Sequence, residues 1–501
     1  DGDVQLRFGE VFEQALRLAS ALRRRGVNGG DVVSFQLPNW HETVIINLAA
    51  AIGGFVCNPI VPIYRDAEVG FILKQSRAKA LFIPETFRGI GYRDMVERLR
   101  ADLPGLEHVI CLRPASGSDE FQEWLREDGA AIEDFSDPDA NAVKLLLYTS
   151  GTTGEPKGVL HSHNTLRSDI DATIRFWDAS AEEVVLMPSP VTHITGYLYA
   201  LELPFALGVP VVLMDRWQAA EAVRLIERFK VTIGLGATPF LAELTNEVEK
   251  SGIGLSSLRF FVSGGAAVSP EIILRASAAL PNCRVFRAYG CSEAPTISLG
   301  LPPDQPAERG ATTDGLICNH EVRIVDPVTG VDLPAGREGE ILTRGPEVML
   351  GYTKPEHNAD AFDADGYFRT GDLGCVDPDG YITITGRKKD LIIRGGENIS
   401  PKEIEDVLHQ HPSIAEAAVV AMPHPRMGET PCACVILRPG AMLDFDAMIG
   451  FLDAAKLARQ KFPERLVLMN GLPRNAAGKV LKHALRAAVA EETLAGIENA
   501  R

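Results

Sequence analysis

Helical and strand-like patterns alternate along most of this chain, and no other feature restricts its fold as strongly. Residues 8–25 place apolar side chains on one broad face of an expected helix, which ends at Gly26. Short apolar runs typical of strands follow at residues 31–37, 80–83, 108–112, 143–148, 184–187 and 209–214. Helical segments such as 219–229 lie between several of these runs. The alternation predicts an α/β fold built in layers.

The pattern changes in the last third of the chain. Between about residues 318 and 386, strand patterns alternate with turns rich in Gly, Asp and Pro, which predicts a β-rich subdomain. The 501 residues are too many for one compact core. We therefore predict a large N-terminal domain over residues 1–389 and a small α+β C-terminal domain over residues 390–501, with a hinge near Asp390 in a dense basic run.

The chain is strongly acidic. Its 50 Lys and Arg residues against 67 Asp and Glu residues give a net charge of −17. Such a surface repels nucleic-acid backbones and anionic membranes, so we expect no nucleic-acid partner. An anionic ligand would need a local binding site.

Cysteine usage and the apolar segments indicate the compartment. The eight cysteines form no CxxC pair and no dense framework, which is typical of reduced thiols. The most apolar stretch, residues 43–63, is interrupted by asparagines, glycines and a proline, so a buried helix followed by a strand fits it better than a membrane span. Since no secretory signal is visible, we predict a cytoplasmic protein without an integral membrane segment.

The strongest local signal is the segment 148–158, YTSGTTGEPKG, which directly follows an apolar strand run. Its glycines let the backbone turn N–H groups toward an anion, its hydroxyls add donors, and Lys157 adds positive charge. A flexible surface loop is the plainer alternative. The segment is no Walker A loop, because Lys157 precedes a glycine, and residues 234–239 are no dinucleotide fingerprint, because a proline replaces the third glycine.

Five further positions carry groups suited to a nucleotide. The ring of Tyr289 can stack on a base, and the carboxylate of Glu293 can hold Mg²⁺ beside phosphates. Asp372 ends a tight turn and can accept hydrogen bonds from a ribose. Arg387 can bind the same ribose or phosphates, and Lys479 lies in a glycine-containing loop that can reach a cleft. Alone, each has an ordinary alternative: a buried tyrosine, a solvated acid, a turn aspartate, a linker cation and a surface lysine.

In this order and at these separations, the clusters resemble those of the acyl-adenylate-forming enzymes: acyl-CoA synthetases, aryl-CoA ligases, luciferases and the adenylation domains of peptide synthetases. The resemblance extends from residues 26–31 through residues 395–400 to Lys479. It implies a ligase that converts a carboxylic acid and ATP into acyl-AMP and pyrophosphate, and then passes the acyl group to a thiol. It also implies ATP, Mg²⁺ and coenzyme A as cofactors, and a small C-terminal domain that rotates between the two steps.

The resemblance assigns roles to individual residues. It implies a phosphate loop made of Thr149, Ser150, Gly151, Thr152, Thr153, Gly154 and Lys157. It implies a site for adenine and ribose made of Gly264, Gly265, Ala266, Tyr289, Gly290, Asp372 and Arg387. Ser292 matches a hydroxyl near phosphate, and Glu293 matches the Mg²⁺ ligand. The residues expected to act in catalysis are Lys479, Glu293, Thr149 and His193.

Other matches concern the thiol step and the acyl group. Lys479 matches the lysine that contacts the carboxylate and the α-phosphate, and Asp390 falls at the hinge. Gly395 and Gly396 match the loop that meets the pantetheine tunnel. His193 falls where the family keeps an aromatic residue beside the acyl pocket, although a histidine taken alone is more often a core or surface residue.

The acid is less closely defined. The expected walls of the acyl pocket are His193, Gly236, Phe240, Gly264, Gly290, Cys291 and Ile297. Most of these residues are small or apolar, which suits an uncharged acyl or ring group. Residues 191–195 include no acid to hold an amino group, which disfavours an amino acid. Segments such as 35–40 and 394–400 look most like those of short/medium-chain fatty acid and cyclohexanecarboxylate CoA ligases, and benzoate-type acids stay open.

Three rival interpretations remain. A non-catalytic nucleotide sensor on the same fold is disfavoured because Glu293 and Lys479 are both retained, and no motif identifies a luciferase-like oxygenating enzyme. Metal sites at residues 161 and 163 or at residues 432 and 434 are weakly supported, since neither pair has further ligands in view. The sequence does not define the oligomeric state.

Overall fold

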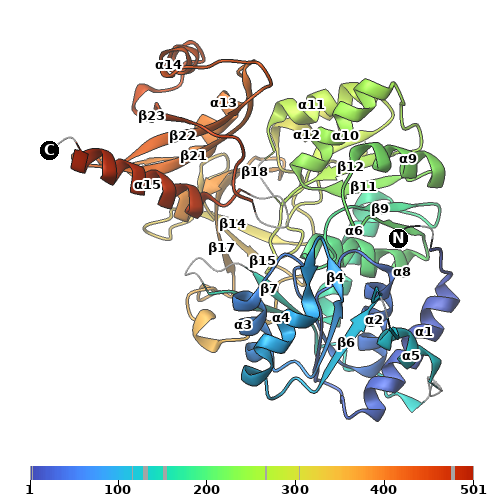
Figure 1. Ribbon diagram of the computed structural model, residues 1–501. Coiled ribbons are helices and arrows are strands. Elements are labelled where there is room, and N and C mark those ends of the chain that lie inside the picture. The colour runs from blue at the N-terminus through green and yellow to red at the C-terminus, as the bar shows by residue number, and fades with distance from the viewer. Residues whose placement is uncertain are drawn as a thin grey trace.

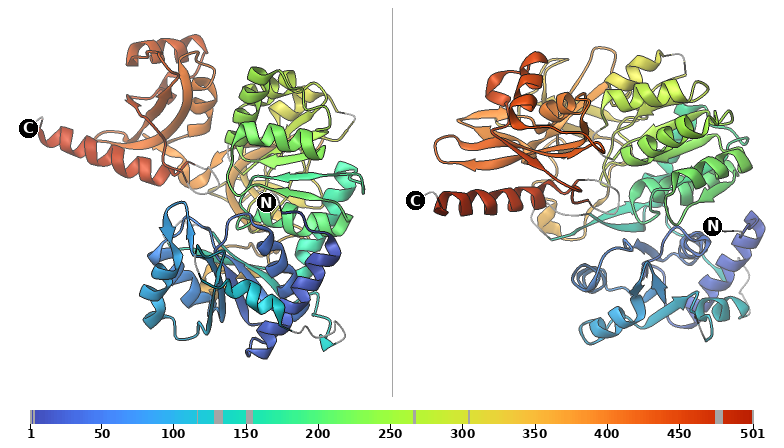
Figure 2. Two further views of the ribbon diagram at one scale, coloured as in Figure 1. Left: turned by 45° about the vertical axis from the view of Figure 1, so that its right-hand side comes forward. Right: turned by 45° about the horizontal axis from the view of Figure 1, so that its top comes forward.

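The computed structural model describes residues 2, 4–115, 117–127, 134–149, 155–265, 268–303, 305–474 and 480–499, and side chains up to residue 491. Figure 1 and both views in Figure 2 show a large part built around three sheets and a smaller C-terminal lobe standing beside it. This architecture agrees with the predicted α/β class.

The first sheet has seven strands in the order β16–β8–β7–β2–β1–β3–β6. Its strands are β1 (Val32–Phe35), β2 (Val56–Pro59), β3 (Ala80–Pro84), β6 (His108–Leu112), β7 (Val143–Thr149), β8 (Lys157–Ser162) and β16 (Gly351–Tyr352). The strands from β7 to β6 are parallel, whereas β8 and β16 add on as antiparallel strands. The elements around it are α1 (Phe8–Arg24), α2 (His41–Gly53), α3 (Asp66–Ser76), α4 (Tyr92–Leu99), α5 (Glu120–Arg126) and the hairpin of β4 (Thr86–Phe87) and β5 (Ile90–Gly91).

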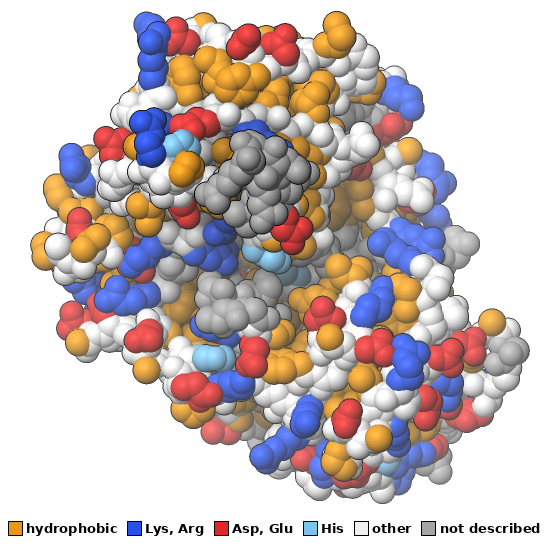
Figure 3. Space-filling view, turned by 60° about the vertical axis from the view of Figure 1, so that its left-hand side comes forward, with side chains coloured by type: hydrophobic (Ala, Val, Ile, Leu, Met, Phe, Trp, Pro, Cys, Tyr) orange, Lys and Arg blue, Asp and Glu red, His pale blue; other side chains and the backbone are white. Residues whose placement is uncertain are grey.

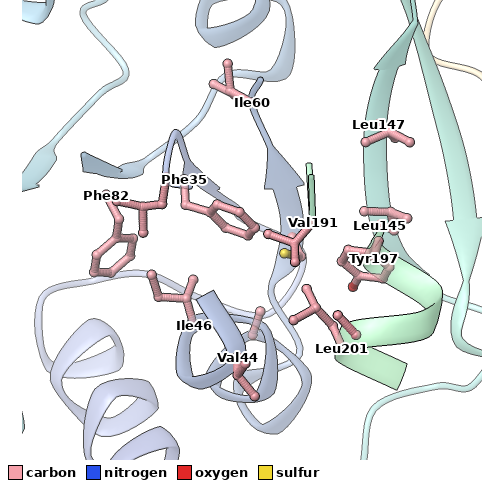
Figure 4. Close-up of a cluster of buried hydrophobic side chains, with 14 of the residues drawn as sticks. Phe35, Val44, Ile46, Ile60, Phe82, Leu145, Leu147, Val191, Tyr197 and Leu201 are labelled. Atoms are coloured by element: carbon pink, nitrogen blue, oxygen red, sulfur yellow. The ribbon is translucent and has the colours of Figure 1, made fainter. Parts of the chain in front are cut away.

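The predicted buried helix and strand in residues 43–63 are confirmed as α2 and β2. Gly54 ends α2 with φ of 67°, a left-handed conformation that glycine adopts without strain and that turns the chain into β2. Figure 4 shows how the apolar face of α2 meets the first sheet: the ring of Phe35 points toward Val191, which comes from a later segment, and Ile46 lies on the other side of Phe35 in the same cluster. All three side chains have no exposed surface, so this core joins the first sheet to the second.

The second sheet is fully parallel and has the order β10–β9–β11–β12–β13. Its strands are β9 (Val185–Met187), β10 (Val211–Leu213), β11 (Ile233–Gly236), β12 (Phe260–Ser263) and β13 (Arg284–Arg287). The helices around it are α6 (His163–Trp177), α7 (Ile194–Gly196), α8 (Leu203–Leu207), α9 (Ala219–Phe229), α10 (Thr238–Ser251), α11 (Pro270–Ala279) and α12 (Ala307–Thr312), with a π-helical turn, Tyr197–Glu202, between α7 and α8. Ligands of parallel sheets bind beyond the carboxyl ends of the strands, which here all lie at one edge.

The third sheet forms the predicted β-rich subdomain. It is antiparallel, with the order β14–β15–β17–β18. Its strands are β14 (Glu321–Val325), β15 (Gly339–Arg344), β17 (Phe368–Val376) and β18 (Ile382–Arg387). A short turn over residues 377–381 joins β17 to β18, as the Gly, Asp and Pro residues of this region predict, whereas the connection from β15 to β17 is long and contains β16.

The C-terminal lobe has a sheet and cores of its own. Strands β20 (Glu397–Ile399), β19 (Ile392–Arg394), β22 (Gly428–Leu437) and β21 (Ile414–His424) follow one another, and β23 (Arg465–Leu468) pairs with β22. Helices α13 (Pro401–Leu408), α14 (Phe445–Ala454) and α15 (Lys482–Asn499) complete the lobe. Apolar side chains such as Ile404 and Val419 form a separate core in it. The domain boundary at residue 390 stays a prediction.

A helix that crosses a lipid bilayer needs about 20 mostly apolar residues. Within the described ranges, no helix has both the length and the apolar composition that crossing a membrane requires.

Candidate active site

A cleft of about 1110 Å³ opens where the three sheets of the large part meet. Figure 3 shows the molecule hollowed between its upper and lower halves on the face turned to the viewer. The carboxyl ends of β11, β12 and β13 contribute Gly236, Gly264 and Ala288 to the cleft wall. The position agrees with the general location of ligand sites in parallel sheets.

Tyr289, Asp372 and Arg387 form what we call the Asp372 cluster. The hydroxyl of Tyr289 donates to Oδ2 of Asp372 at 2.8 Å, and Nε of Arg387 lies 2.8 Å from Oδ1 of the same carboxylate. Strand register brings the acid and the arginine together, because Asp372 on β17 pairs with Arg387 on β18. The structure thus assembles three residues that the sequence places up to about a hundred positions apart.

Burial and hydrogen bonding define the charge of this cluster. Burial, followed by the charge of Asp372, raises the pKa of Tyr289 well above its usual value, so Tyr289 stays a neutral donor. Asp372 is only 4% exposed. Its backbone N–H donates to the Thr370 hydroxyl, 3.0 Å away, which holds the turn in shape. The carboxylate is therefore held between a cation and a neutral donor.

Glu293 lies in the same cleft beside Tyr352 and Lys157. The Tyr352 hydroxyl donates to Oε1 of Glu293 at 2.8 Å, and Nζ of Lys157 lies 4.9 Å from the centroid of the Tyr352 ring. Burial and the Glu293 charge raise the pKa of Tyr352, so its proton stays in place. Thr149 also lines the cleft and pairs with Lys157 at the ends of β7 and β8.

Part of the predicted phosphate loop lies outside the described residues. This applies to Ser150, Gly151, Thr152, Thr153 and Gly154, and also to Ala266 and Lys479. Their roles stay predictions.

Gly290 and Gly264 lie where the backbone passes very close to its neighbours. A Cβ at Gly290 would meet the carbonyl oxygen of Pro295 at 1.9 Å, and one at Gly264 would meet that of Ala288 at 2.8 Å. Neither position has room for a side chain, so glycine is required there for packing. Gly265, which has φ of 76°, continues the same wall.

Ser292 is buried in the cleft wall, and its carbonyl oxygen is bound by His161. The Nε2 atom of His161 lies 2.7 Å from that oxygen, and burial lowers the pKa of His161 to about 4, so the ring is neutral. Among the residues that the structure describes, no group of three or more His, Cys, Asp or Glu side chains is arranged to hold a metal ion. The hydrogen bond of His161 to the Ser292 carbonyl oxygen supports this loop.

The predicted acyl-pocket residues separate into two groups. His193, Gly236, Gly264, Gly290 and Cys291 line the cleft. Phe240 and Ile297 are not among its described lining residues. The Phe240 ring instead packs on Trp217, with centroids 4.9 Å apart, and Ile297 is fully buried in the core.

Three predicted residues of the C-terminal lobe, Asp390, Gly395 and Gly396, are not among the described residues that line the cleft. Gly395 and Gly396 form the turn between β19 and β20, where the N–H of Gly395 donates to the Met427 carbonyl at 2.8 Å. Asp390 is paired with Arg486 on α15 at 2.6 Å. The hinge and tunnel roles remain predictions.

Sequence reasoning missed several residues of the cleft. Tyr352 is separated from Glu293 by 59 positions, and Trp177, Tyr199 and Thr296 come from three further segments. None of them belongs to a motif. A buried polar residue in an apolar helical pattern, such as Asp169 in α6, is the one signal that could have directed attention to this region.

Comparisons with known proteins define the class. Residues 1–353 match the AMP-binding enzyme family, and residues 403–479 match the AMP-binding enzyme C-terminal domain. The chain belongs to the AMP-binding enzyme family, and its relatives include acyl-CoA ligases, the branch that the sequence predicts.

Two relatives and one solved structure show how far the similarity extends. The chain is 37% identical over 476 residues to the medium-chain fatty-acid–CoA ligase of Escherichia coli (strain K12), covering 94% of this chain and 83% of that protein. It is 32% identical over 506 residues to a (methyl-dioxo-octahydro-indenyl)propanoyl:CoA ligase of Rhodococcus jostii (strain RHA1), covering 97% and 94%. ATP-bound MatB from Rhodopseudomonas palustris superposes with a TM-score of 0.87 at 30% identity, covering 96% of this chain and 93% of that one.

Proposed function

We propose that this protein is an AMP-forming acyl-CoA ligase that activates an uncharged carboxylic acid of short or medium chain, or an alicyclic acid. The observation that carries the proposal is the single cleft, which is lined by Tyr289 and Arg387 of the Asp372 cluster and by Glu293 and Lys157, beside a wall of small and apolar residues. Family membership supplies the chemistry that such a cleft would perform.

The proposed reaction has two steps. A carboxylate oxygen of the acid attacks the α-phosphorus of ATP, the bond from that phosphorus to the bridging oxygen breaks, and pyrophosphate leaves. The sulfur of CoA then attacks the acyl carbon of the mixed anhydride, and AMP leaves with the bonding electrons. Because the first step brings anions together, the cleft has to offset negative charge. Lys157 and Arg387 supply positive charge there, and Lys479 would add to it.

The residues around Glu293 fit a magnesium ion. Mg²⁺ is bound by one or two carboxylates together with phosphate oxygens and water, so a single cleft carboxylate suits a site completed by a nucleotide. Glu293 has one oxygen engaged by Tyr352 and faces the cleft. The ion would supply neutralisation of phosphate charge.

The Asp372 cluster is suited to the ribose and base. Asp372 would accept hydrogen bonds from ribose hydroxyls, as the motif predicts, and its pairing with Arg387 holds the side chain in position. Tyr289 would present its ring to the adenine.

The proposed acid class is supported by the wall and by the relatives. Gly236, Gly264 and Gly290 line the cleft and bring no side-chain charge to its wall. One relative is named for medium-chain fatty acids and another for a propanoyl group on a saturated ring system. An aryl acid of the benzoate type is the alternative within the same activity, because a pocket for a saturated ring nearly fits an aromatic one.

The test is formation of AMP and acyl-CoA with ATP, Mg²⁺ and CoA, using butyrate, octanoate, palmitate, cyclohexanecarboxylate, benzoate and an amino acid. We expect the highest kcat/KM with octanoate or cyclohexanecarboxylate. Preference for benzoate would select the aryl alternative. ATP binding without AMP formation on any acid would favour the non-catalytic sensor and contradict the ligase.

Lys479→Ala separates the two half-reactions. We expect it to abolish acyl-AMP formation and to leave thioester formation from supplied acyl-AMP largely intact, because a cation is needed where the carboxylate meets the phosphate. Equal loss of both half-reactions would contradict the assignment of Lys479.

A further inference from the structure

One side of the cleft presents hydroxyl groups, although the sequence predicts small and apolar walls. Thr192, Tyr199 and Thr296 line it, and we call these three residues the polar floor. Each is at most 5% exposed. Trp177 lines the cleft beside them, with its ring centroid 5.4 Å from that of Tyr199. The neighbouring His193 is one of the predicted acyl-pocket residues, so the floor lies at the acyl side of the cleft.

Hydrogen bonding fixes the direction of the hydroxyl protons in the polar floor. The Thr296 hydroxyl donates to Oδ2 of Asp169 at 2.7 Å, and the hydroxyls of Thr296 and Tyr199 lie 3.0 Å apart. A hydroxyl has one proton. Since Thr296 gives its proton to Asp169, Tyr199 must be the donor to Thr296. The Thr173 hydroxyl lies 3.5 Å from the Tyr199 oxygen and faces one of its lone pairs, which leaves the other lone pair to accept a hydrogen bond.

Asp169 holds this arrangement from behind. It is fully buried on α6, and its carboxyl group interacts directly with that of Glu347. The side-chain amide of Asn319 donates to Oε1 of Glu347 at 2.5 Å, and Nε2 of His320 lies 3.1 Å from Oε2 of Glu347. Oδ1 of Asp169 has no hydrogen-bond partner among the described residues, and a proton shared between the two carboxyl groups would satisfy it. Burial and the Glu347 charge raise the pKa of Asp169, in agreement with such a proton.

Thr192 contributes a second polar group. Its hydroxyl is buried and has no hydrogen-bond partner in the part of the chain that the structure describes. A buried hydroxyl without a partner is costly, so a ligand or water is expected to complete it. It can both donate and accept.

We propose that the polar floor recognises a hydroxyl group on the acyl part of the substrate, so that the enzyme activates hydroxy acids in preference to the corresponding unsubstituted acids. The substrate hydroxyl donates to the Tyr199 oxygen, and Thr192 lies on the same floor to complete its bonding. Asp169 is a positioning residue that acts through Thr296. The inference rests on the proposed ligase function and names the acid class more closely.

The physical basis of the preference is the cost of unpaired polar groups. An alkyl chain or plain ring would cover the Tyr199 oxygen and the Thr192 hydroxyl without pairing them, whereas a hydroxyl pairs with either. A site built to bind a hydroxyl discriminates strongly against an analogue that lacks it. A ketone can accept a hydrogen bond but cannot donate one, so a keto acid should pair with Thr192 alone. Its kcat/KM should lie between those of the hydroxy acid and the unsubstituted acid.

The test compares matched acids on the full-length enzyme. The acids are 4-hydroxy-, 4-oxo- and unsubstituted cyclohexanecarboxylate, together with 8-hydroxyoctanoate and octanoate, and the readouts are pyrophosphate release and acyl-CoA formation. We expect kcat/KM for at least one hydroxy acid to exceed that of its unsubstituted partner by about tenfold or more, mostly through KM. Tyr199→Phe and Thr296→Val should bring that ratio close to one.

Conservative variants distinguish a role of Thr296 and Asp169 in orienting Tyr199 from a general effect on folding. Thr296→Ser keeps the hydroxyl and should keep the preference. Asp169→Asn keeps an acceptor for Thr296 and a donor toward Glu347, so it should also keep the preference, whereas Asp169→Leu should lose it. Tyr92→Phe is the matched control: this fully buried tyrosine donates to the Pro62 carbonyl at 2.8 Å and is absent from the described cleft wall, so the ratio should not change.

The outcomes distinguish this inference from the proposed function. Activation of octanoate or cyclohexanecarboxylate with no hydroxy acid preferred would overturn the inference and leave the ligase standing. A preference that survives in Tyr199→Phe and Thr296→Val would also overturn it. Failure to release pyrophosphate with every acid would overturn the ligase and the inference together.

Discussion

The Asp372 cluster and the polar floor both adjoin one cleft, where Tyr289 and Arg387 line the wall and Asp372 is bound to them, but different forces hold the two groups. Asp372 and Arg387 face each other across two paired strands, and an ion pair joins them. In the polar floor, Tyr199 comes from a π-helical turn, Thr296 from a loop, and the supporting Asp169 from a helix. No strand pairing aligns these three residues. The first group is thus set by backbone register and charge, and the second by a chain of buried hydroxyls.

The difference has a consequence for the effect of substitutions. Backbone hydrogen bonds along β17 and β18 keep the Asp372 cluster in place when one side chain changes, so the damage stays local. The polar floor has only its side-chain contacts, and each hydroxyl orients the next. The loop from Tyr289 to Ser298 connects the two groups, because the residues at its ends pair with each other and Thr296 lies within it.

Gly290→Ala should damage both groups and produce the largest effect. A Cβ at this position would meet two carbonyl oxygens, those of Pro295 at 1.9 Å and Ala294 at 3.0 Å, so the backbone must move. Because Tyr289 and Thr296 flank the displaced segment, ATP use and acid discrimination should fall together. We expect a loss of about 3 kcal/mol in the free energy of unfolding, measured in urea.

Gly254→Ala is the matched control for this substitution. A Cβ at Gly254 would meet no atom within 4 Å. Its stability and activity should therefore match those of the wild type. A stable, fully active Gly290→Ala enzyme would contradict the close approach in this loop.

Asp372→Asn should affect the nucleotide without affecting the acid. The substitution keeps the shape and removes the charge that pairs with Arg387, leaving a partly buried cation without its partner. A hydrogen bond to a charged group contributes about 2 kcal/mol, so KM for ATP should rise about thirtyfold. The ratio of kcat/KM between a hydroxy acid and its unsubstituted partner should stay at the wild-type value.

Asp377→Asn tests whether that effect is specific to the cleft. Asp377 follows the same strand and pairs with Arg309 at 2.8 Å on the surface. Exposed pairs contribute little, so KM for ATP should not change. A change of the acid ratio in Asp372→Asn would show that the two groups are coupled.

The same difference explains what the sequence could predict. Residues of the Asp372 cluster and Glu293 lie in short motifs whose order identifies the family, and the alternating patterns predict the sheets that carry them. Tyr199 and Thr296 lie in no motif, because a hydroxyl in a packed segment has no distinctive neighbours along the chain. Their proximity depends on the packing of α6 against a loop more than a hundred positions away. Phe240 packs on Trp217 and Ile297 is buried in a core, so a place close to a motif along the chain does not determine which way a side chain points.

Glu347→Gln should change how stability depends on pH, because the carboxyl pair behind the polar floor holds a buried proton near neutral pH. Burial raises the pKa of Glu347 from 4.5 to about 7. Between these values the folded chain holds a proton that the unfolded chain has lost, so the free energy of unfolding falls as pH rises from about 4.5 to about 7. One pKa unit corresponds to about 1.4 kcal/mol, and we expect at least this loss in the wild type relative to the variant.

Glu321 is the control for this titration, because its pKa is shifted in the opposite direction. Hydrogen bonds from Arg344, followed by the one from Tyr367, lower the pKa of the exposed Glu321. Its contribution to stability is present above its ordinary pKa and is lost as pH falls, so Glu321→Gln should leave the range from pH 5 to 7 unchanged. Urea unfolding at several pH values measures both variants. A wild-type slope that Glu347→Gln retains would contradict a shared proton in this pair.

Arg486→Ala should have the smallest effect and should leave the Asp372 cluster and the polar floor unchanged. Arg486 on α15 holds Asp390 at 2.6 Å and also contacts the carbonyl of Lys389 at 3.4 Å. If Asp390 is the hinge, as predicted, this pair favours the present arrangement of the lobe, and its loss shifts the balance between the two half-reactions. A partly exposed ion pair contributes at most about 1 kcal/mol, which limits the change in their rate ratio to about fivefold.

Arg459→Ala removes an exposed pair with Asp453 far along the same lobe and should change neither rate. Stopped-flow measurement of both half-reactions tests this expectation. If Arg486→Ala altered KM for ATP or the ratio of kcat/KM between a hydroxy acid and its unsubstituted partner, the C-terminal lobe would shape the cleft itself. The Asp372 cluster and the polar floor would then not be independent of the lobe.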